Sequence, residues 1–192
     1  DHMSAQYFTA PEIFDGERAH IKSALKIAGG RVAEISALSD VPAGAELTIF
    51  DTGMIAPGFV DLQVNGGGGV LMNDAPSVET IRRICDAHRQ FGTTSLLATL
   101  ITDTPDITRT ALAAGIEAER LGVPGFAGLH IEGPHLSAAR KGTHDPALIR
   151  PMTDLDLSEL QAAKKHLRTL YVTVAPESVT IDQVAALTAA GV

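Results

Sequence analysis

The sequence has few of the features that would indicate a secreted, membrane or nucleic-acid-binding protein. Its one cysteine, Cys85, cannot form an internal disulfide, which favours a reducing compartment such as the cytoplasm. No apolar run approaches the ~20 residues that a bilayer-spanning helix needs, and no signal peptide is recognisable, so no membrane partner is expected. Basic residues occur in runs of two at most and the net charge is -8, which argues against binding to nucleic acid.

Aromatic residues are also scarce at 4% of the chain, whereas 45% of the residues are hydrophobic and 18 are glycines. This composition argues against disorder and is typical of an α/β protein with many tight turns. A length of 192 residues is enough for one domain, or for one domain and a small additional one.

The chain divides into three segments of different character. Residues 1–4 resemble a cloning remnant and the N-terminus, so His2 is not counted as a candidate ligand. Residues 5–56 contain short strand patterns, with Gly29-Gly30 as the turn of a predicted hairpin. A Pro-Gly pair then marks the boundary to residues 57–192, where the pattern changes.

From residue 57 onward, strand patterns and helix patterns alternate four times. This alternation implies a parallel sheet covered by helices, which closes either as an open doubly wound sheet or as a (β/α)8 barrel. The predicted strands are 59–65, 93–101, 126–132 and 170–175, and the predicted helices are 77–91, 105–121, 155–167 and 181–190.

The polar residues of two of these strands favour the barrel. Gln63 and Asn65 share one face of the first strand, and His130 and Glu132 share one face of the third. A strand between two helix layers is apolar on both faces, whereas polar groups near the C-terminal ends of strands are typical of a barrel's active-site end. We therefore expect an α/β fold that comprises the first four βα units of a TIM (β/α)8 barrel.

A complete barrel has eight such units and ~250 residues. Because the sequence stops after the fourth helix, we expect a truncated chain that is a piece of a longer polypeptide. The alternative is a complete four-stranded α/β protein.

Glu132 is the strongest candidate for chemistry. It ends a predicted strand, where a carboxylate can bind a cation such as Zn²⁺. The loop that follows is long for a connection in such a fold, and long loops are usually functional. Its donors suit a polyhydroxylated or phosphorylated ligand, and they are Arg140, Lys141, Thr143 and His144.

Structural interpretations are open for the other histidines of this region. His130 is equally well a hydrogen-bonded core histidine, and His135 and Arg140 are equally well solvated loop residues. His166 lies in a predicted helix and is expected to be exposed. The glycine run from Gly66 to Gly69 lets the backbone turn freely, but no Gly-Lys-Ser/Thr follows it, so it is not a P-loop.

A specific resemblance is carried by several motifs in order. Amidohydrolase-superfamily enzymes have a Pro-Gly-x-x-Asp-x-His-x-His signature at their first barrel strand, and here Gln63 and Asn65 occupy the two histidine places. This sequence therefore resembles the N-acetylglucosamine-6-phosphate deacetylases. The further motifs are Gly92-Thr93-Thr94-Ser95, Thr99-Leu100-Ile101-Thr102, His130-Ile131-Glu132-Gly133-Pro134, Lys141-Gly142-Thr143-His144 and Val174-Ala175-Pro176-Glu177.

The resemblance implies roles for particular residues. Glu132 would bind one divalent metal ion, taken as zinc, and Thr143 and His144 would contact an amino-sugar phosphate. Gln63 and Asn65 would belong to the substrate site and mark a subgroup with one metal ion instead of two. The two metal-binding histidines and the general-base aspartate would lie beyond residue 192, so no catalytic residue is expected within this chain.

The resemblance also implies a fold, an activity and a partner. Residues 5–56 would be part of a small β-sandwich, and the parent enzyme would be a homodimer. That enzyme would hydrolyse N-acetylglucosamine 6-phosphate to glucosamine 6-phosphate and acetate with a metal-activated water. Two alternatives remain: another metal-dependent amidohydrolase of the dihydroorotase or deaminase type, against which Gln63 and Asn65 argue, or a non-catalytic fragment.

Overall fold

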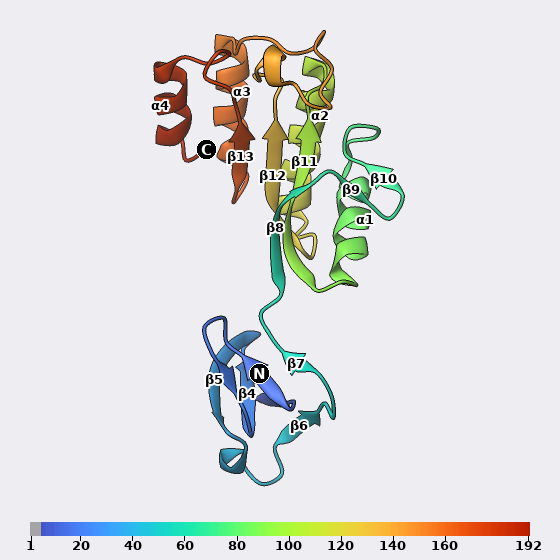
Figure 1. The fold of residues 1–192 in the computed structure, drawn as a ribbon, viewed down its shortest axis with the longest axis vertical. Coiled ribbons are helices and arrows are strands. Elements are labelled where there is room, and N and C mark those ends of the chain that lie inside the picture. The colour runs from blue at the N-terminus through green and yellow to red at the C-terminus, as the bar shows by residue number, and fades with distance from the viewer. Residues whose placement is uncertain (1–4) are drawn as a thin grey trace. The chain divides into compact units, whose positions relative to one another are not determined.

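The structure is a computed structural model that describes residues 5–192 and consists of two compact units (Figure 1). The chain passes from the first unit to the second between Pro57 and Gly58. The predicted cloning remnant, residues 1–4, lies outside the described residues.

The first unit consists of short strands in a four-stranded sheet, ordered β5-β4-β1-β6, and a three-stranded sheet, ordered β3-β2-β7. The predicted hairpin is present, because β4 and β5 pair antiparallel and both glycines of the Gly29-Gly30 turn have positive φ angles. The strands are β1 (Gln6–Thr9), β2 (Glu12–Phe14), β3 (Ala19–His20), β4 (Ser23–Ala28), β5 (Arg31–Ala37), β6 (Glu46–Ile49) and β7 (Met54–Ile55), with a 3-10 turn at Leu38–Asp40.

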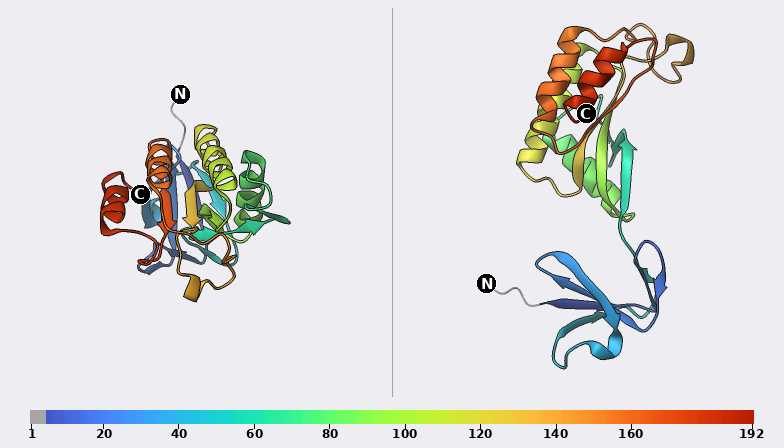
Figure 2. Two further views of the ribbon diagram at one scale, coloured as in Figure 1. Left: turned by 90° about the horizontal axis from the view of Figure 1, so that it is seen from above. Right: turned by 90° about the vertical axis from the view of Figure 1, so that its left-hand side faces the viewer.

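The second unit is built on a parallel sheet of four strands. These are β8 (Phe59–Val64), β11 (Thr93–Ile101), β12 (Phe126–Glu132) and β13 (Leu170–Thr173), ordered β13-β12-β11-β8. The spatial order follows the chain without a reversal, and the helices α1, α2 and α3 lie on one face (Figure 2). A doubly wound sheet would reverse its order and carry helices on both faces. The prediction of four barrel units is therefore confirmed.

The helices begin where the sequence indicates. Ser77, Thr104, Thr153 and Thr180 each cap a helix by accepting a hydrogen bond from a backbone N–H of its first turn. The helices are α1 (Val78–Arg89), α2 (Pro105–Arg120), α3 (Asp154–Lys164) and α4 (Ile181–Ala189). Short strands β9 (Gly66–Gly67) and β10 (Val70–Leu71) and a 3-10 turn at Ala138–Arg140 complete the unit.

The largest difference from the predicted helix bounds is at the end of α3. Helix α3 was expected to reach residue 167 but ends at Lys164. The next three N–H groups, of Lys165, His166 and Leu167, bond to carbonyls three residues back, which tightens the chain into turns. His166 is exposed as expected, but it lies in this turn rather than in a helix.

The main hydrophobic core fills the space between the sheet and its helices. Leu129 of β12 is fully buried there and packs so closely on α2 that a Cβ at Gly115 would lie 2.4 Å from its Cδ1. Cys85 of α1 belongs to this core, and burial raises the pKa of its thiol to about 11. It is the small buried hydrophobe that the sequence predicts.

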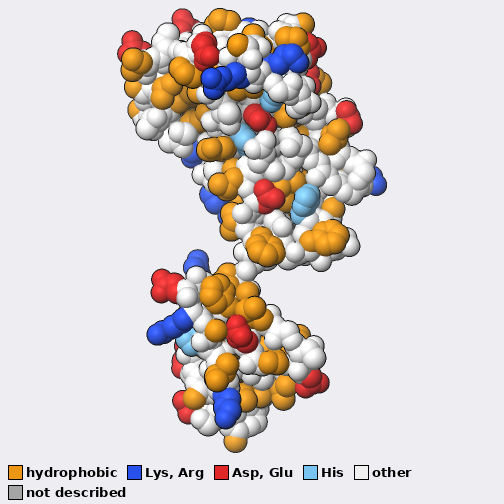
Figure 3. All heavy atoms as spheres, in the orientation of Figure 1, with side chains coloured by type: hydrophobic (Ala, Val, Ile, Leu, Met, Phe, Trp, Pro, Cys, Tyr) orange, Lys and Arg blue, Asp and Glu red, His pale blue; other side chains and the backbone are white. Residues whose placement is uncertain are grey.

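Strand β8 lies at an edge of the sheet and buries little of its own surface. Phe59 is 68% exposed and Val60 is 67% exposed. Hydrophobic side chains are visible on the surface of the unit (Figure 3). Of the six residues of β8, only Val64 is buried in the core.

Candidate active site

Polar side chains converge at the C-terminal end of the parallel sheet. Gln63 stands near the end of β8, and Glu132 is the last residue of β12. The amide Nε2 of Gln63 donates a hydrogen bond of 2.8 Å to Glu132 Oε2. The two strands are separated by β11, so this contact crosses the concave face of the sheet.

His144 reaches the same carboxylate from the long loop after β12. Its side chain is buried, and its Nδ1 accepts a 3.4 Å hydrogen bond from the backbone N–H of Thr102 and lies 2.8 Å from the Thr102 hydroxyl. In the neutral ring an accepting Nδ1 leaves the hydrogen on Nε2. That Nε2 lies 3.5 Å from Glu132 Oε1, so Glu132 is approached by one donor at each oxygen.

All five residues predicted for the site line one cavity of about 220 Å³. Gln63, Asn65, Glu132, Thr143 and His144 are joined there by Leu71, Asn73 and Ile101. A wider, more open cavity of about 660 Å³ lies on the other side of Glu132 and His144 and includes Arg140 and Lys141. The structure thus brings the five predicted residues together in one cavity.

Two residues of this arrangement were missed at the sequence level. Thr102, which orients His144, stands within a quoted motif but carried no predicted role. Asn73 bonds through its side chain to both the N–H and the C=O of Ile101, at 3.1 Å each, and so ties the glycine-rich segment to β11. No local pattern around Asn73 indicates this contact.

The structure resolves the open interpretations of two histidines. His130 is a core residue: it is 2% exposed, its Nε2 lies 2.8 Å from the Thr173 hydroxyl, and burial lowers its pKa. The solvated interpretation of His135 is wrong, because this side chain is 4% exposed and its Nδ1 lies 3.1 Å from the carbonyl oxygen of Arg150. Burial lowers the pKa of His135 as well.

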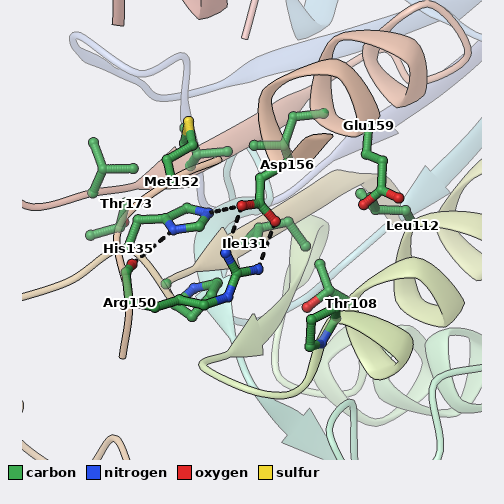
Figure 4. Close-up of a pocket in the computed structure, with 15 residues that line it drawn as sticks. Thr108, Leu112, Ile131, His135, Arg150, Met152, Asp156, Glu159 and Thr173 are labelled. Atoms are coloured by element: carbon green, nitrogen blue, oxygen red, sulfur yellow. Dashed lines mark hydrogen bonds and ion pairs between the residues drawn. The ribbon is translucent and has the colours of Figure 1, made fainter. Parts of the chain in front are cut away.

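The base of the loop that carries Thr143 and His144 is closed by an ion pair (Figure 4). Arg150 binds both oxygens of Asp156 with distances of 2.6 and 2.7 Å. The hydroxyl and backbone N–H of Thr153 also donate to Asp156, which completes the capping box of α3. Burial raises the pKa of Asp156, but these hydrogen bonds outweigh it and hold that pKa well below its usual range.

The described residues do not supply enough ligands for a catalytic metal ion. Such an ion normally needs three protein ligands. Within residues 5–192 no three His, Cys, Asp or Glu side chains are placed to hold one, and the carboxylate of Glu132 is already engaged by Gln63. The described residues therefore do not form a metal site by themselves.

Comparison with known proteins gives the family. The model of the amidohydrolase family matches residues 54–191. The chain belongs to the amidohydrolase family. Members of this family are hydrolases and are generally metal-dependent. The matched range contains the whole parallel sheet and every predicted site residue of this amidohydrolase chain.

Named relatives are amino-sugar phosphate deacetylases. The amidohydrolase chain is 46% identical over 140 residues to an N-acetylgalactosamine-6-phosphate deacetylase of Shewanella sp. strain ANA-3, covering 73% of this chain and 35% of that protein. It is 36% identical over 138 residues to an N-acetylglucosamine-6-phosphate deacetylase of Haemophilus influenzae, covering 72% and 36%. The chain therefore spans little more than a third of these relatives.

A solved structure confirms the fold and the resemblance. The N-acetylglucosamine-6-phosphate deacetylase of Pasteurella multocida superposes with a TM-score of 0.91 at 28% identity, covering 98% of this chain and 49% of that one. In the described part of the amidohydrolase chain, each helix is too short or too polar to cross a bilayer.

Proposed function

We propose that this amidohydrolase chain is part of an enzyme that hydrolyses the acetamide of an amino-sugar 6-phosphate. The substrate we infer is N-acetylglucosamine 6-phosphate, and the products are glucosamine 6-phosphate and acetate. The observation that carries this is the Gln63–Glu132 contact, because it joins Gln63, which stands at a histidine place of the superfamily signature, to the carboxylate proposed as a metal ligand. The names of the relatives support the same reaction.

The described residues would bind and orient the substrate. His144, which lies beside Glu132, would contact the substrate, and the neighbouring Thr143 lines both cavities. Gln63 would hold the carboxylate of Glu132 in one orientation, with Asn65 next to it on the cavity wall. Holding the reacting group in place is itself a large contribution to catalysis.

Glu132 would be one ligand of a single divalent metal ion, for which we propose zinc. The remaining ligands, two histidines, and the general-base aspartate would come from outside residues 5–192. The 192-residue chain alone is accordingly proposed to be inactive. We also propose that residues 5–56 are part of a β-sandwich, that residues 57–192 belong to the catalytic barrel, and that the complete enzyme is a cytoplasmic homodimer.

A second substrate is favoured by a specific observation. The 46% identity is to a deacetylase named for N-acetylgalactosamine 6-phosphate, which differs at one hydroxyl of the sugar. An epimer is distinguished only by hydrogen bonds to that hydroxyl. The deciding experiment measures acetate release from both epimers by the longer protein and by the 192-residue chain.

The outcomes separate the possibilities. Acetate release from either epimer by the longer protein supports the reaction, and the ratio of kcat/KM identifies the substrate. Hydrolysis of dihydroorotate or adenine, with no acetate release, would support the other amidohydrolase types instead. Activity of the 192-residue chain alone would contradict the proposed need for further residues.

A further inference from the structure

Two cavities meet at Glu132 and His144, and they differ in size and in chemistry. The smaller, of about 220 Å³, extends toward β8 and β10, and the larger, of about 660 Å³, extends toward β13. An amide that reacts beside Glu132 has an acyl group on one side of its C–N bond and a sugar on the other. The two cavities therefore offer separate places for its two ends.

The polar groups in the wall of the smaller cavity are largely occupied. Asn73 Nδ2 donates to the carbonyl of Ile101 at 3.1 Å and to Asp103 Oδ2 at 2.8 Å, while Asn73 Oδ1 accepts from the Ile101 N–H. Gln63 Nε2 is engaged with Glu132. Glu132, Thr143 and His144 are shared with the larger cavity, so Asn65 is, among the described residues, the one further polar residue that lines the smaller cavity alone. A sugar hydroxyl or a phosphate would find few partners here, so its desolvation would be poorly compensated.

Two apolar side chains line the smaller cavity. They are Leu71 of β10 and Ile101, the last residue of β11. The larger cavity also has apolar residues in its lining, but it adds the hydrogen-bond donors Arg140, Lys141 and Ser137. The difference in chemistry places the apolar end of a substrate in the smaller cavity and the phosphorylated end in the larger one.

The position of Leu71 is fixed by close backbone contacts. Leu71 pairs with Gly66 in the β9–β10 hairpin, where a Cβ at Gly66 would lie 2.3 Å from the carbonyl oxygen of Val70 and 2.6 Å from Leu71 Cδ2. His88 of α1 holds the hairpin from behind, with Nε2 2.9 Å from the carbonyl oxygen of Gly66. A wall held in this way cannot recede to admit a longer group.

We infer that the cavity bounded by Leu71 and Ile101 is an acyl subsite, and that Leu71 sets the length of the acyl group that is hydrolysed. This inference rests on the proposed function, since it names a part of the same site. In an apolar pocket, one methylene changes kcat/KM by roughly 10- to 200-fold. Leu71 is 48% exposed, so its replacement removes little of the core.

The experiment compares N-acetyl, N-propionyl and N-butyryl derivatives of the amino-sugar 6-phosphate as substrates of the longer protein. Leu71→Ala is expected to raise kcat/KM for the butyryl relative to the acetyl substrate by roughly tenfold or more. Leu71→Phe is expected to lower the propionyl-to-acetyl ratio below that of the unmodified protein. The control is Leu155→Ala, an exposed leucine on α3 that lines neither cavity, and its ratios should be unchanged.

Each outcome decides something different. If the unmodified protein releases no carboxylic acid from any of the three substrates, the proposed function fails and the inference fails with it. If it hydrolyses the acetyl substrate but Leu71→Ala and Leu71→Phe leave the acyl-length ratios within twofold of the unmodified protein, the acyl subsite alone is overturned. Leu71→Val, which removes one carbon, replaces Leu71→Ala if thermal melting shows that the alanine variant does not fold.

Discussion

Gln63 and Glu132 are joined by a 2.8 Å hydrogen bond although their strands are not neighbours in the sheet. The amide of Gln63 is a donor at a place where most members of the superfamily carry a histidine. A neutral amide orients a carboxylate without competing for a cation, since amides are poor zinc ligands beside imidazole. The contact therefore holds Oε2 of Glu132, while Oε1 of the same carboxylate lies 3.5 Å from Nε2 of His144.

Replacement of Gln63 by leucine should lower activity with little effect on stability. The variant removes one hydrogen bond to a charged group, worth about 1.5–3 kcal/mol, so a decrease in kcat/KM of roughly tenfold or more is expected in the longer protein. Gln90→Leu, at the exposed end of α1, is the matched control. Equal kinetics for the Gln63 variant and its control would show that the contact does not orient Glu132.

Thr102→Val should disturb His144 without removing it. The variant keeps the size of the side chain but loses the hydroxyl that lies 2.8 Å from His144 Nδ1. A loss of about 1 kcal/mol, equivalent to roughly a fivefold decrease in kcat/KM, is expected, and His144→Asn should cost more. Nitrogen NMR of labelled histidine tests the geometry independently, because His144 should carry its proton on Nε2. A proton on Nδ1 at neutral pH would contradict the assignment.

Asp156→Asn should destabilise the chain in a pH-dependent way. The folded-state pKa of Asp156 is depressed, so its stabilising contribution is present above the unfolded pKa of about 3.9 and is lost as the pH falls through the folded value. Urea unfolding at pH 7 should show a loss of about 2 kcal/mol, and the difference from the unmodified chain should shrink below pH 4. Asp154→Asn, in the same helix turn but exposed, should have a much smaller effect. A constant difference across this pH range would argue against the Arg150–Asp156 pair as its source.

Gly115→Ala should destabilise the chain although alanine is the better helix former. Helix propensity alone would favour alanine by about 1 kcal/mol, but the new Cβ would lie 2.4 Å from Leu129 Cδ1. Overpacking of this kind typically costs about 1–3 kcal/mol. Ala113→Gly, on the exposed side of the same helix, measures the propensity effect alone and should also destabilise. A stabilised Gly115→Ala variant would mean that α2 moves away from β12 without cost.

The barrel units were predictable because several local signals agree. The strands Thr93–Ile101 and Phe126–Glu132 have the predicted bounds, since their apolar runs end at glycines or at polar residues. Helix starts were equally clear from their capping residues, such as Ser77. The end of α3 was not, because the apolar Leu167 continues the helical pattern although the backbone has already tightened into turns.

The candidate site was predicted in composition but not in its connections. Polar residues at strand ends identified Gln63 and Glu132, because strands of one parallel sheet end at the same edge. The burial of His135 was not predictable, since it depends on Arg150, 15 residues later, returning to the same place. Contacts between two distant parts of a long loop leave no periodic pattern in the sequence.

The exposed edge of β8 has a practical consequence. In the four-stranded sheet β8 and β13 each have one neighbour, and β8 also exposes Phe59 and Val60. Such an edge is a template for another strand. We expect a solution of the 192-residue chain to change its composition with concentration. A dilute kinetic assay would then contain monomers. A concentrated crystallisation sample of the same preparation would contain associated chains.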